Sequence, residues 1–110
     1  MKKILICSPK ESLRESLKLI LGNIYDLILT DSPEQCCDIL TSAKIGTLLI
    51  DYTEGIPEVL SKISAQKNRP KTIAILNPRQ DSLAKEAKQL GAAGYLTTPL
   101  KADEVLKICH

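Results

Sequence analysis

The sequence predicts an α/β fold, a doubly wound sheet of five parallel strands with helices on both faces. Two observations lead to this prediction. Short apolar runs alternate five times with segments whose apolar residues recur at helical spacing, which is the arrangement of consecutive βα units. The chain has 110 residues, enough for one hydrophobic core and too few for two. We therefore expect a single (βα)5 domain over residues 1–110.

The first unit begins with the apolar run KILIC at residues 3–7, which predicts a short buried strand. The helix after it has two candidate starts. Ser12 and Ser8 each stand three residues ahead of a glutamate, the spacing of a capping box. Apolar residues then recur at i, i+4, i+7 and i+8 up to Gly22, where we expect the helix to end.

The second and third units follow the same order. DLILT at residues 26–30 predicts the second strand, and a helix start follows it, with Ser32 as the cap and Pro33 in the first turn. TLLID at residues 47–51 predicts the third strand, and a short loop leads to a helix from about Pro57. The expected inward positions of these two helices are Cys36, Cys37, Ile39, Leu40, Val59, Leu60 and Ile63.

The last two units complete the predicted sheet. TIAIL at residues 72–76 predicts the fourth strand, with a helix over about residues 82–90. GYLTT at residues 94–98 predicts the fifth strand, and a short final helix starts near Asp103.

Composition argues against two classes of function. The net charge is +2 and the basic residues are scattered along the sequence, which gives direct nucleic-acid binding little support. No apolar run approaches the roughly 20 residues of a membrane-spanning helix. The apolar stretch after Lys3 is too short for a signal peptide, so we expect a cytoplasmic protein.

The cysteines do not predict a metal site. They are Cys7, Cys36, Cys37 and Cys109, without a CxxC pair, and the single histidine is His110. We interpret them as small buried hydrophobic residues in a reducing compartment.

A doubly wound sheet binds ligands outside the carboxyl ends of its strands, near the switch in strand order. Functional residues are therefore expected where the predicted strands end. These positions are Cys7-Ser8-Pro9, Thr30-Asp31, Asp51-Tyr52, Asn77-Pro78 and Thr97-Thr98-Pro99.

Several segments resemble the receiver domains of two-component response regulators, which accept a phosphoryl group from a histidine kinase. KKILIC followed by SLRESLKLIL resembles the first strand and helix of that family, YDLILTDSPEQCCDIL its second unit, and TLLID its acceptor strand. GAAGYLTTPLKADEVL resembles the fifth strand, the Lys-Pro turn and the final helix, and is the most specific match. The resemblance covers nearly the whole chain and implies a flavodoxin-like fold.

The resemblance implies roles for five positions. Asp51 stands at the phosphoryl acceptor position. The acid pair that holds Mg²⁺ in the family is replaced by Ser8 and Pro9. Asn77 replaces the Ser or Thr that binds the phosphoryl oxygens, and Thr98 replaces the lysine of the Lys-Pro turn. Only the acceptor is retained.

These replacements matter because phosphoryl transfer depends on positioning and charge neutralisation. Mg²⁺ requires oxygen ligands and usually takes one or two carboxylates from protein, whereas Ser8 offers a neutral hydroxyl and Pro9 no side-chain ligand. Loss of one preorganised charge-stabilising donor typically lowers the rate about 10²–10³-fold. We therefore expect an atypical, or pseudo-, receiver: no enzyme, no catalytic residue, no bound cofactor, and inefficient Mg²⁺-dependent phosphorylation of Asp51.

The resemblance also implies an output. Tyr95 matches the switch aromatic of the family, although a strand tyrosine can equally be a sheet-edge residue, and both interpretations stay open. The resemblance to the family is best preserved in the fourth helix, fifth strand and fifth helix. Because receivers commonly pair through this surface, it implies homodimerisation or docking there. The domain would be the N-terminal module of a longer regulator, often a transcription factor, with a sensor histidine kinase as a further partner.

Three alternatives stay open. The first is a functional phosphorelay receiver phosphorylated on Asp51, with a metal arrangement that uses Asp31 or Glu54. The second is a phosphocysteine carrier or phosphatase that uses Cys7, although the loop in ILICSPKESLR contains Pro and Glu and has Leu13 where an arginine is needed. The third is a flavin or small-ligand binder, for which a glycine-rich phosphate loop is missing.

Overall fold

The computed structural model describes residues 2–53, 55–67 and 69–110, so Glu54 lies outside the described residues. The strands are β1 (Lys3–Cys7), β2 (Asp26–Thr30), β3 (Thr47–Asp51), β4 (Lys71–Leu76) and β5 (Gly94–Thr97). The helices are α1 (Glu11–Leu21), α2 (Pro33–Ser42), α3 (Ile56–Ser64), the 3₁₀ helix η1 (Pro78–Leu83), α4 (Ala84–Gln89) and α5 (Ala102–Cys109). Within the described residues no helix is both long and apolar enough to cross a membrane.

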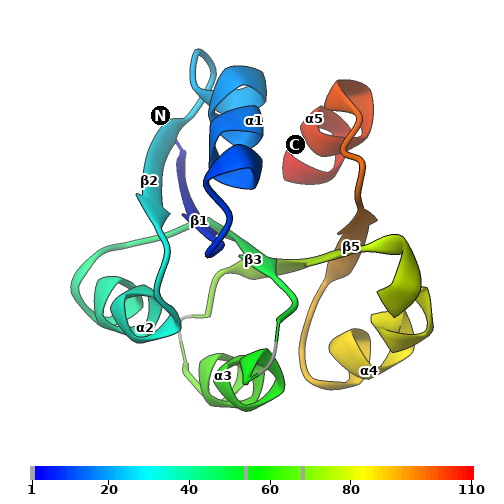
Figure 1. Ribbon diagram of the computed structural model, residues 1–110. Coiled ribbons are helices and arrows are strands. Elements are labelled where there is room, and N and C mark those ends of the chain that lie inside the picture. The colour runs from blue at the N-terminus through cyan, green and yellow to red at the C-terminus, as the bar shows by residue number, and fades with distance from the viewer. Residues whose placement is uncertain (1, 54, 68) are drawn as a thin grey trace.

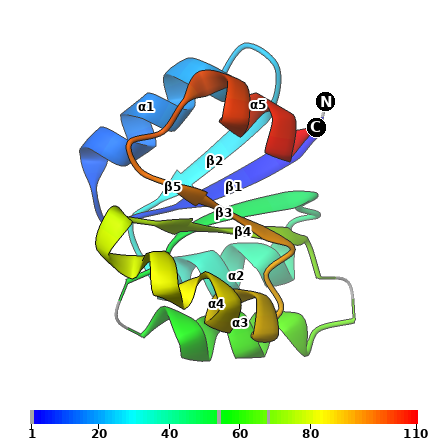
Figure 2. The ribbon, with the colours of Figure 1, turned by 90° about the vertical axis from the view of Figure 1, so that its right-hand side faces the viewer.

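The five strands form one parallel sheet in the order β2-β1-β3-β4-β5. Helices α1 and α5 cover one face of the sheet, and α2, α3 and α4 cover the other (Figure 1). Figure 2 shows the same three layers after a quarter turn. The predicted doubly wound, flavodoxin-like (βα)5 fold is confirmed.

Each face of the sheet carries its own hydrophobic core, because successive strand side chains point to opposite faces. Strand β3 at the centre is buried at all five positions. On the α1 and α5 face the core contains Ile4, Ile6, Leu13, Leu17, Leu21, Leu49, Ile73, Ile75, Leu96, Val105 and Cys109. On the opposite face it contains Leu5, Cys7, Cys36, Leu48, Ile50, Tyr52, Ile56, Leu60, Ile63, Ala74, Leu76 and Ala87, among others.

Both capping boxes predicted for the first helix are wrong. Helix α1 begins at Glu11 with Lys10 as the N-cap, and no side chain caps it. Ser12 lies inside the first turn, and the hydroxyl of Ser8 is directed at strand β3 instead. The start of α2 is as predicted: Ser32 accepts a hydrogen bond from the backbone N–H of Gln35 at 3.3 Å.

The helical segment after β4 starts earlier than predicted. It begins as a 3₁₀ helix at Pro78, not near Ser82, and only its last six residues form the α-helix α4. The reason is local, because the side-chain oxygen Oδ1 of Asn77 accepts hydrogen bonds from the N–H groups of Arg79 and Gln80 at 2.9 and 3.1 Å. Asn-Pro-Arg-Gln is a helix-start pattern, with Asn as the cap, Pro in the first turn and Gln three residues after the cap.

Candidate functional site

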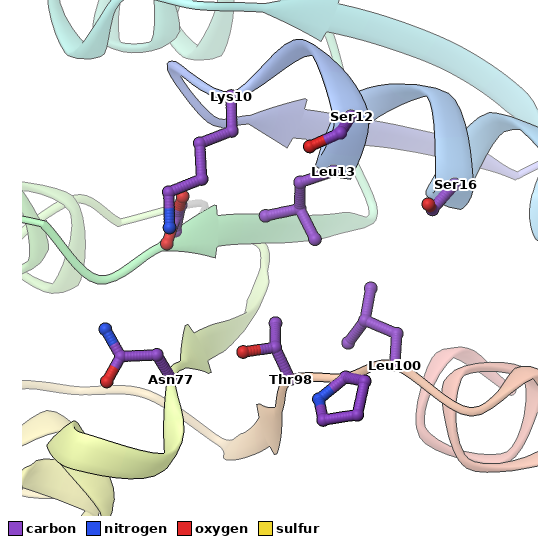
Figure 3. Close-up of a pocket in the computed structure, with 9 residues that line it drawn as sticks. Lys10, Ser12, Leu13, Ser16, Asn77, Thr98 and Leu100 are labelled. Atoms are coloured by element: carbon purple, nitrogen blue, oxygen red, sulfur yellow. The ribbon is translucent and has the colours of Figure 1, made fainter.

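The candidate site lies where the order of the strands reverses, between β1 and β3 at their carboxyl ends. A pocket of about 390 Å³ opens there (Figure 3). Its lining comes from the start of α1 on one side and from the ends of β4 and β5 on the other. The lining residues are Lys10, Ser12, Leu13, Ser16, Asp51, Asn77, Thr98, Pro99 and Leu100.

Asp51 is the last residue of β3, and its side chain is 6% exposed. Alternation along the strand puts it on the same face as Leu49, toward α1 and α5. The hydroxyl of Ser8 donates a hydrogen bond to Oδ2 of Asp51 at 2.9 Å, and Ser8 is completely buried. The structure therefore brings the acceptor position and the first degenerate acid position into direct contact.

Local hydrogen bonds hold the loop between β1 and α1 around Ser8. The N–H of Lys10 donates to Oγ of Ser8 at 3.1 Å, and Nη1 of Arg14 donates to the carbonyl oxygen of Ser8 at 2.7 Å. The N–H of Ser8 donates to the carbonyl oxygen of Thr30 at 3.1 Å. Pro9 is exposed and contributes no polar side chain. Ser8 thus shapes the turn and also binds Asp51.

The residues at this site do not fit the Mg²⁺ ion that binds in the family. Asp51 is the carboxylate that lines the pocket, and the Ser8 hydroxyl is engaged with it. Asp31, at the end of β2, is exposed and does not line the pocket. Within the described part of the chain, no three His, Cys, Asp or Glu side chains gather into a metal site. A hard divalent ion prefers more oxygen charge than one carboxylate supplies.

The opposite side of the pocket supplies no positive charge to Asp51. The side-chain carbonyl of Asn77 caps η1, and the N–H of Asn77 donates to Oε1 of Gln80 at 3.0 Å. Thr98 continues the sheet with a backbone hydrogen bond to Leu76 at 2.8 Å, and its peptide bond to Pro99 is cis. Both degenerate positions are therefore at the pocket, but they serve the surrounding backbone.

Tyr52 follows Asp51 at the end of β3, and no sequence pattern gave it a role. It is 3% exposed, and its hydroxyl donates a hydrogen bond to the carboxylate of Glu86 on α4. Nε2 of Gln80 donates to the carbonyl oxygen of Tyr52 at 2.6 Å. Burial, together with the contact to Glu86, raises the pKa of Tyr52. The end of β3 is thus tied to η1 and α4 by two side chains about 30 residues further along the chain.

Tyr95 lies outward on β5, with 38% of its surface exposed. The ammonium group of Lys88 lies 5.6 Å from the centre of its ring, within cation–π range. Beside it is an open hollow of about 610 Å³ between β5 and α5. Its lining residues are Tyr95, Leu96, Thr97, Glu104, Lys107 and Ile108.

Cys7 lies within the core rather than at the pocket. It is 2% exposed and belongs to the core of the α2, α3 and α4 face together with Cys36. A hydrogen bond from the Cys36 thiol lowers the pKa of Cys7, against the opposing effects of burial and of the Asp51 carboxylate. A thiol this deeply buried has no open path to a phosphorylated substrate, which weighs against the Cys7-dependent alternatives.

Neither the protein-family models nor the curated proteins contain a match to this chain. Solved structures do match. Chemotaxis protein CheY4 of Vibrio cholerae has a TM-score of 0.89 at 17% identity, over 99% of this chain and 96% of that one. Full-length FixJ from B. japonicum has a TM-score of 0.86 at 24% identity, over 97% of this chain and 55% of that one. NtrX from Brucella abortus, solved in complex with ADP, has a TM-score of 0.91 at 17% identity, over 99% of this chain and 25% of that one.

Solved structures that resemble this chain include response regulators and signal receiver domains. The chain spans 55% of the length of FixJ and 25% of that of NtrX, so its match to these larger proteins concerns one part of each. The chain therefore has the fold of response regulator receiver domains.

Proposed function

We propose that this chain is an atypical receiver domain, a signalling and protein-interaction module that works without efficient Mg²⁺-dependent phosphorylation of Asp51. One observation carries the proposal. The side chain that contacts Asp51 is the buried hydroxyl of Ser8, in the region where a metal-binding receiver places its acid pair.

The physical argument concerns charge. A phosphoryl group arriving at Asp51 brings negative charge to a carboxylate that is 6% exposed. In a metal-dependent receiver a divalent ion and a lysine neutralise that charge, whereas here Ser8, Asn77 and Thr98 supply neutral side chains. We accordingly propose that the module is not an enzyme and has no resident cofactor.

Phosphorylation with a small-molecule donor tests this proposal. The protein is incubated with acetyl phosphate, with and without Mg²⁺, and its intact mass and backbone amide shifts are followed. We expect no Mg²⁺-dependent increase in mass and no change in the amide shifts of Asp51 and Tyr52. A phosphorylatable receiver treated in parallel controls for the activity of the donor.

The decisive contrary result is a Mg²⁺-dependent gain of one phosphoryl group that disappears in Asp51→Asn. That result would establish the alternative of a functional phosphorelay receiver. A gain of mass that survives Asp51→Asn but disappears in Cys7→Ser would instead favour a phosphocysteine intermediate.

For its output, we propose homodimerisation or docking through α4, β5 and α5. The exposed ring of Tyr95 and the neighbouring hollow between β5 and α5 support this surface. Sedimentation at several protein concentrations tests it. We expect self-association that Tyr95→Glu abolishes and that Leu19→Glu leaves intact, because Leu19 is an 84% exposed apolar side chain on α1, outside the proposed surface. A monomer at high concentration, or loss of association only in Leu19→Glu, would contradict this choice of surface.

The longer neighbours suggest how such a module acts. FixJ and NtrX extend well beyond the part that matches this chain. We propose that the present domain likewise controls an effector, such as a transcription factor, and that a sensor histidine kinase is a further partner. Binding of a kinase without phosphoryl transfer would agree with this proposal.

A further inference from the structure

Tyr52 follows Asp51 directly, but the two side chains lie on opposite faces of the sheet. Asp51 shares its face with Leu49, whereas Tyr52 belongs to the core on the α2, α3 and α4 face. The N–H of Tyr52 donates to the carbonyl oxygen of Ile75 at 2.8 Å, which holds its backbone against β4. Asp51 receives its side-chain hydrogen bond from Ser8, on the face of α1 and α5. Tyr52 therefore connects the strand of Asp51 to the helices of the other face.

Both polar groups of Tyr52 are bound by the segment after β4. Its hydroxyl donates a hydrogen bond to the carboxylate of Glu86 on α4, and its carbonyl oxygen accepts one from Nε2 of Gln80 on η1 at 2.6 Å. Gln80 is in turn fixed by Asn77, whose N–H donates to Oε1 of Gln80 at 3.0 Å. The Tyr52 ring is buried and Glu86 is exposed, so this set of bonds reaches from the core to the surface of α4.

Helix α4 is short, and little apolar surface holds it on the sheet. It spans Ala84–Gln89, and the side chain that it buries completely is the small Ala87. The flanking residues Leu83 and Leu90 are half-buried against the same core. Segments with few buried apolar contacts are those that open or shift most easily. We therefore expect the hydrogen bonds of Tyr52 to contribute much of what fixes α4.

The position of α4 affects the surface proposed for docking. Lys88 lies on α4 beyond Glu86, and its ammonium group is 5.6 Å from the centre of the Tyr95 ring on β5. Tyr95 is exposed and lines the hollow between β5 and α5. Contacts thus run from Tyr52 to Glu86, along α4 to Lys88, and on to Tyr95. A shift of α4 would change how Lys88 and Tyr95 are presented together.

We propose that Tyr52 is a positioning residue for the α4, β5 and α5 surface. Its hydrogen bond to Glu86 holds α4 in one place, so the contact between Lys88 and Tyr95 depends on Tyr52 and is independent of Asp51. This inference rests on the proposed function and deepens it, because it explains how a receiver without efficient phosphoryl transfer presents a constant docking surface.

The nuclear magnetic resonance signals of Lys88 test the proposal. Protons held over an aromatic ring are shifted upfield, so the methylene group beside the Lys88 ammonium reports on its distance from the Tyr95 ring. We expect Tyr52→Phe and Glu86→Ala each to reduce this upfield shift. Glu86→Gln, which keeps an acceptor for the tyrosine hydroxyl, should preserve most of it.

Two further variants serve as controls for these signals. Tyr25→Phe removes a tyrosine hydroxyl that is bound to the carbonyl oxygen of Cys109 on the other face of the sheet. Asp51→Asn changes the acceptor position and leaves both hydrogen bonds of Tyr52 in place. Neither should move the Lys88 signals. A change in Asp51→Asn as large as that in Tyr52→Phe would overturn the proposal, because the surface would then follow the state of Asp51.

Hydrogen exchange at the backbone amides of α4 gives a second measurement. We expect Tyr52→Phe to speed this exchange about two- to threefold, the effect of one hydrogen bond at the low end of its usual range, with a smaller change in α1. In the Glu86→Ala background Tyr52→Phe should have no further effect, because both variants remove the same bond. Additive effects of the two variants, or unchanged Lys88 signals in Tyr52→Phe, would contradict the role assigned to Tyr52.

Failure of the proposed function is distinguishable from failure of this inference. Both measurements use the free domain at low concentration, so they depend neither on phosphoryl transfer nor on self-association. Mg²⁺-dependent labelling of Asp51 by acetyl phosphate would overturn the proposed function, whereas the role of Tyr52 is decided by the Lys88 signals and the exchange in α4.

Discussion

The two sides of the pocket use their polar groups differently. On the β1 and α1 side, Ser8 binds Asp51 directly and Lys10 lines the pocket with it. On the β4 and α4 side, Asn77 caps its own helix, while Gln80 and Glu86 bind Tyr52 rather than Asp51. Asp51 therefore receives its side-chain hydrogen bond from the β1 and α1 side. On the other side, the side-chain hydrogen bonds connect the end of β3 to η1 and α4.

The largest expected effect comes from breaking the supported side. Ser8→Ala leaves the buried carboxylate of Asp51 without its hydrogen-bond donor, and we expect a loss of about 1–3 kcal/mol in the free energy of unfolding. Urea denaturation measures it. Ser12→Ala, an exposed serine on the same lining, is the control and should change stability by less than about 0.5 kcal/mol. Equal losses for the two variants would show that Ser8 does not support Asp51.

An intermediate effect is expected from Asn77 on the other side. Asn77→Ala removes the cap of η1 and should lower the free energy of unfolding by about 1 kcal/mol. Asn77→Asp keeps an acceptor at the N-cap and should retain most of the stability. Neither variant should shift the backbone amide signals of Ser8, because Asn77 serves its own helix. A large shift at Ser8 would mean that the two sides are coupled.

The smallest effect is expected from Tyr52→Phe, which keeps the buried ring and removes the hydrogen bond to the exposed carboxylate of Glu86. We expect a loss of about 0.5 kcal/mol near neutral pH, at the low end for a hydrogen bond. Glu86→Gln, which retains an acceptor, is the matched comparison and should cost less.

The pH dependence of Tyr52 follows from its raised pKa. A tyrosine whose pKa is higher in the folded than in the unfolded protein contributes stability that is complete below about pH 10 and is lost as the pH rises toward the folded value. We therefore expect stability to fall with increasing pH above about 10, and to fall less steeply in Tyr52→Phe. Ultraviolet absorbance should show one tyrosine that ionises late, and its presence in Tyr52→Phe would assign the late ionisation to another residue.

Most of the fold was predictable because its signals are local. Strand β1 and strand β3 have the predicted bounds, and Ser32 caps α2 as expected. The misplaced starts of α1 and α4 have different causes. Ser8 fits the sequence pattern of a helix cap, but its hydroxyl donates a hydrogen bond to Asp51 instead. Asn77 caps η1 through a local pattern that includes Gln80 three residues later.

The site was predictable only in part. The sequence put Asp51 at a strand end, and resemblance gave the degenerate positions Ser8, Pro9, Asn77 and Thr98, all of which lie at or beside the pocket. Tyr95 is 38% exposed on β5, and its two interpretations, a switch aromatic and a sheet-edge residue, both remain predictions.

By itself, the sequence determined the order of strands and helices along the chain, the place of Asp51 and most inward positions of the helices, since these depend on periodicity and on residues a few positions apart. Cys37 is the exception in α2, because it was predicted to be buried and is only half-buried. Only the tertiary structure decided the partners of the polar groups. Ser8 meets Asp51 across 43 residues, and Tyr52 meets Glu86 across 34. Such pairs form because folding buries these groups and brings distant loops to one edge of the sheet, where each buried polar atom takes the partner within reach.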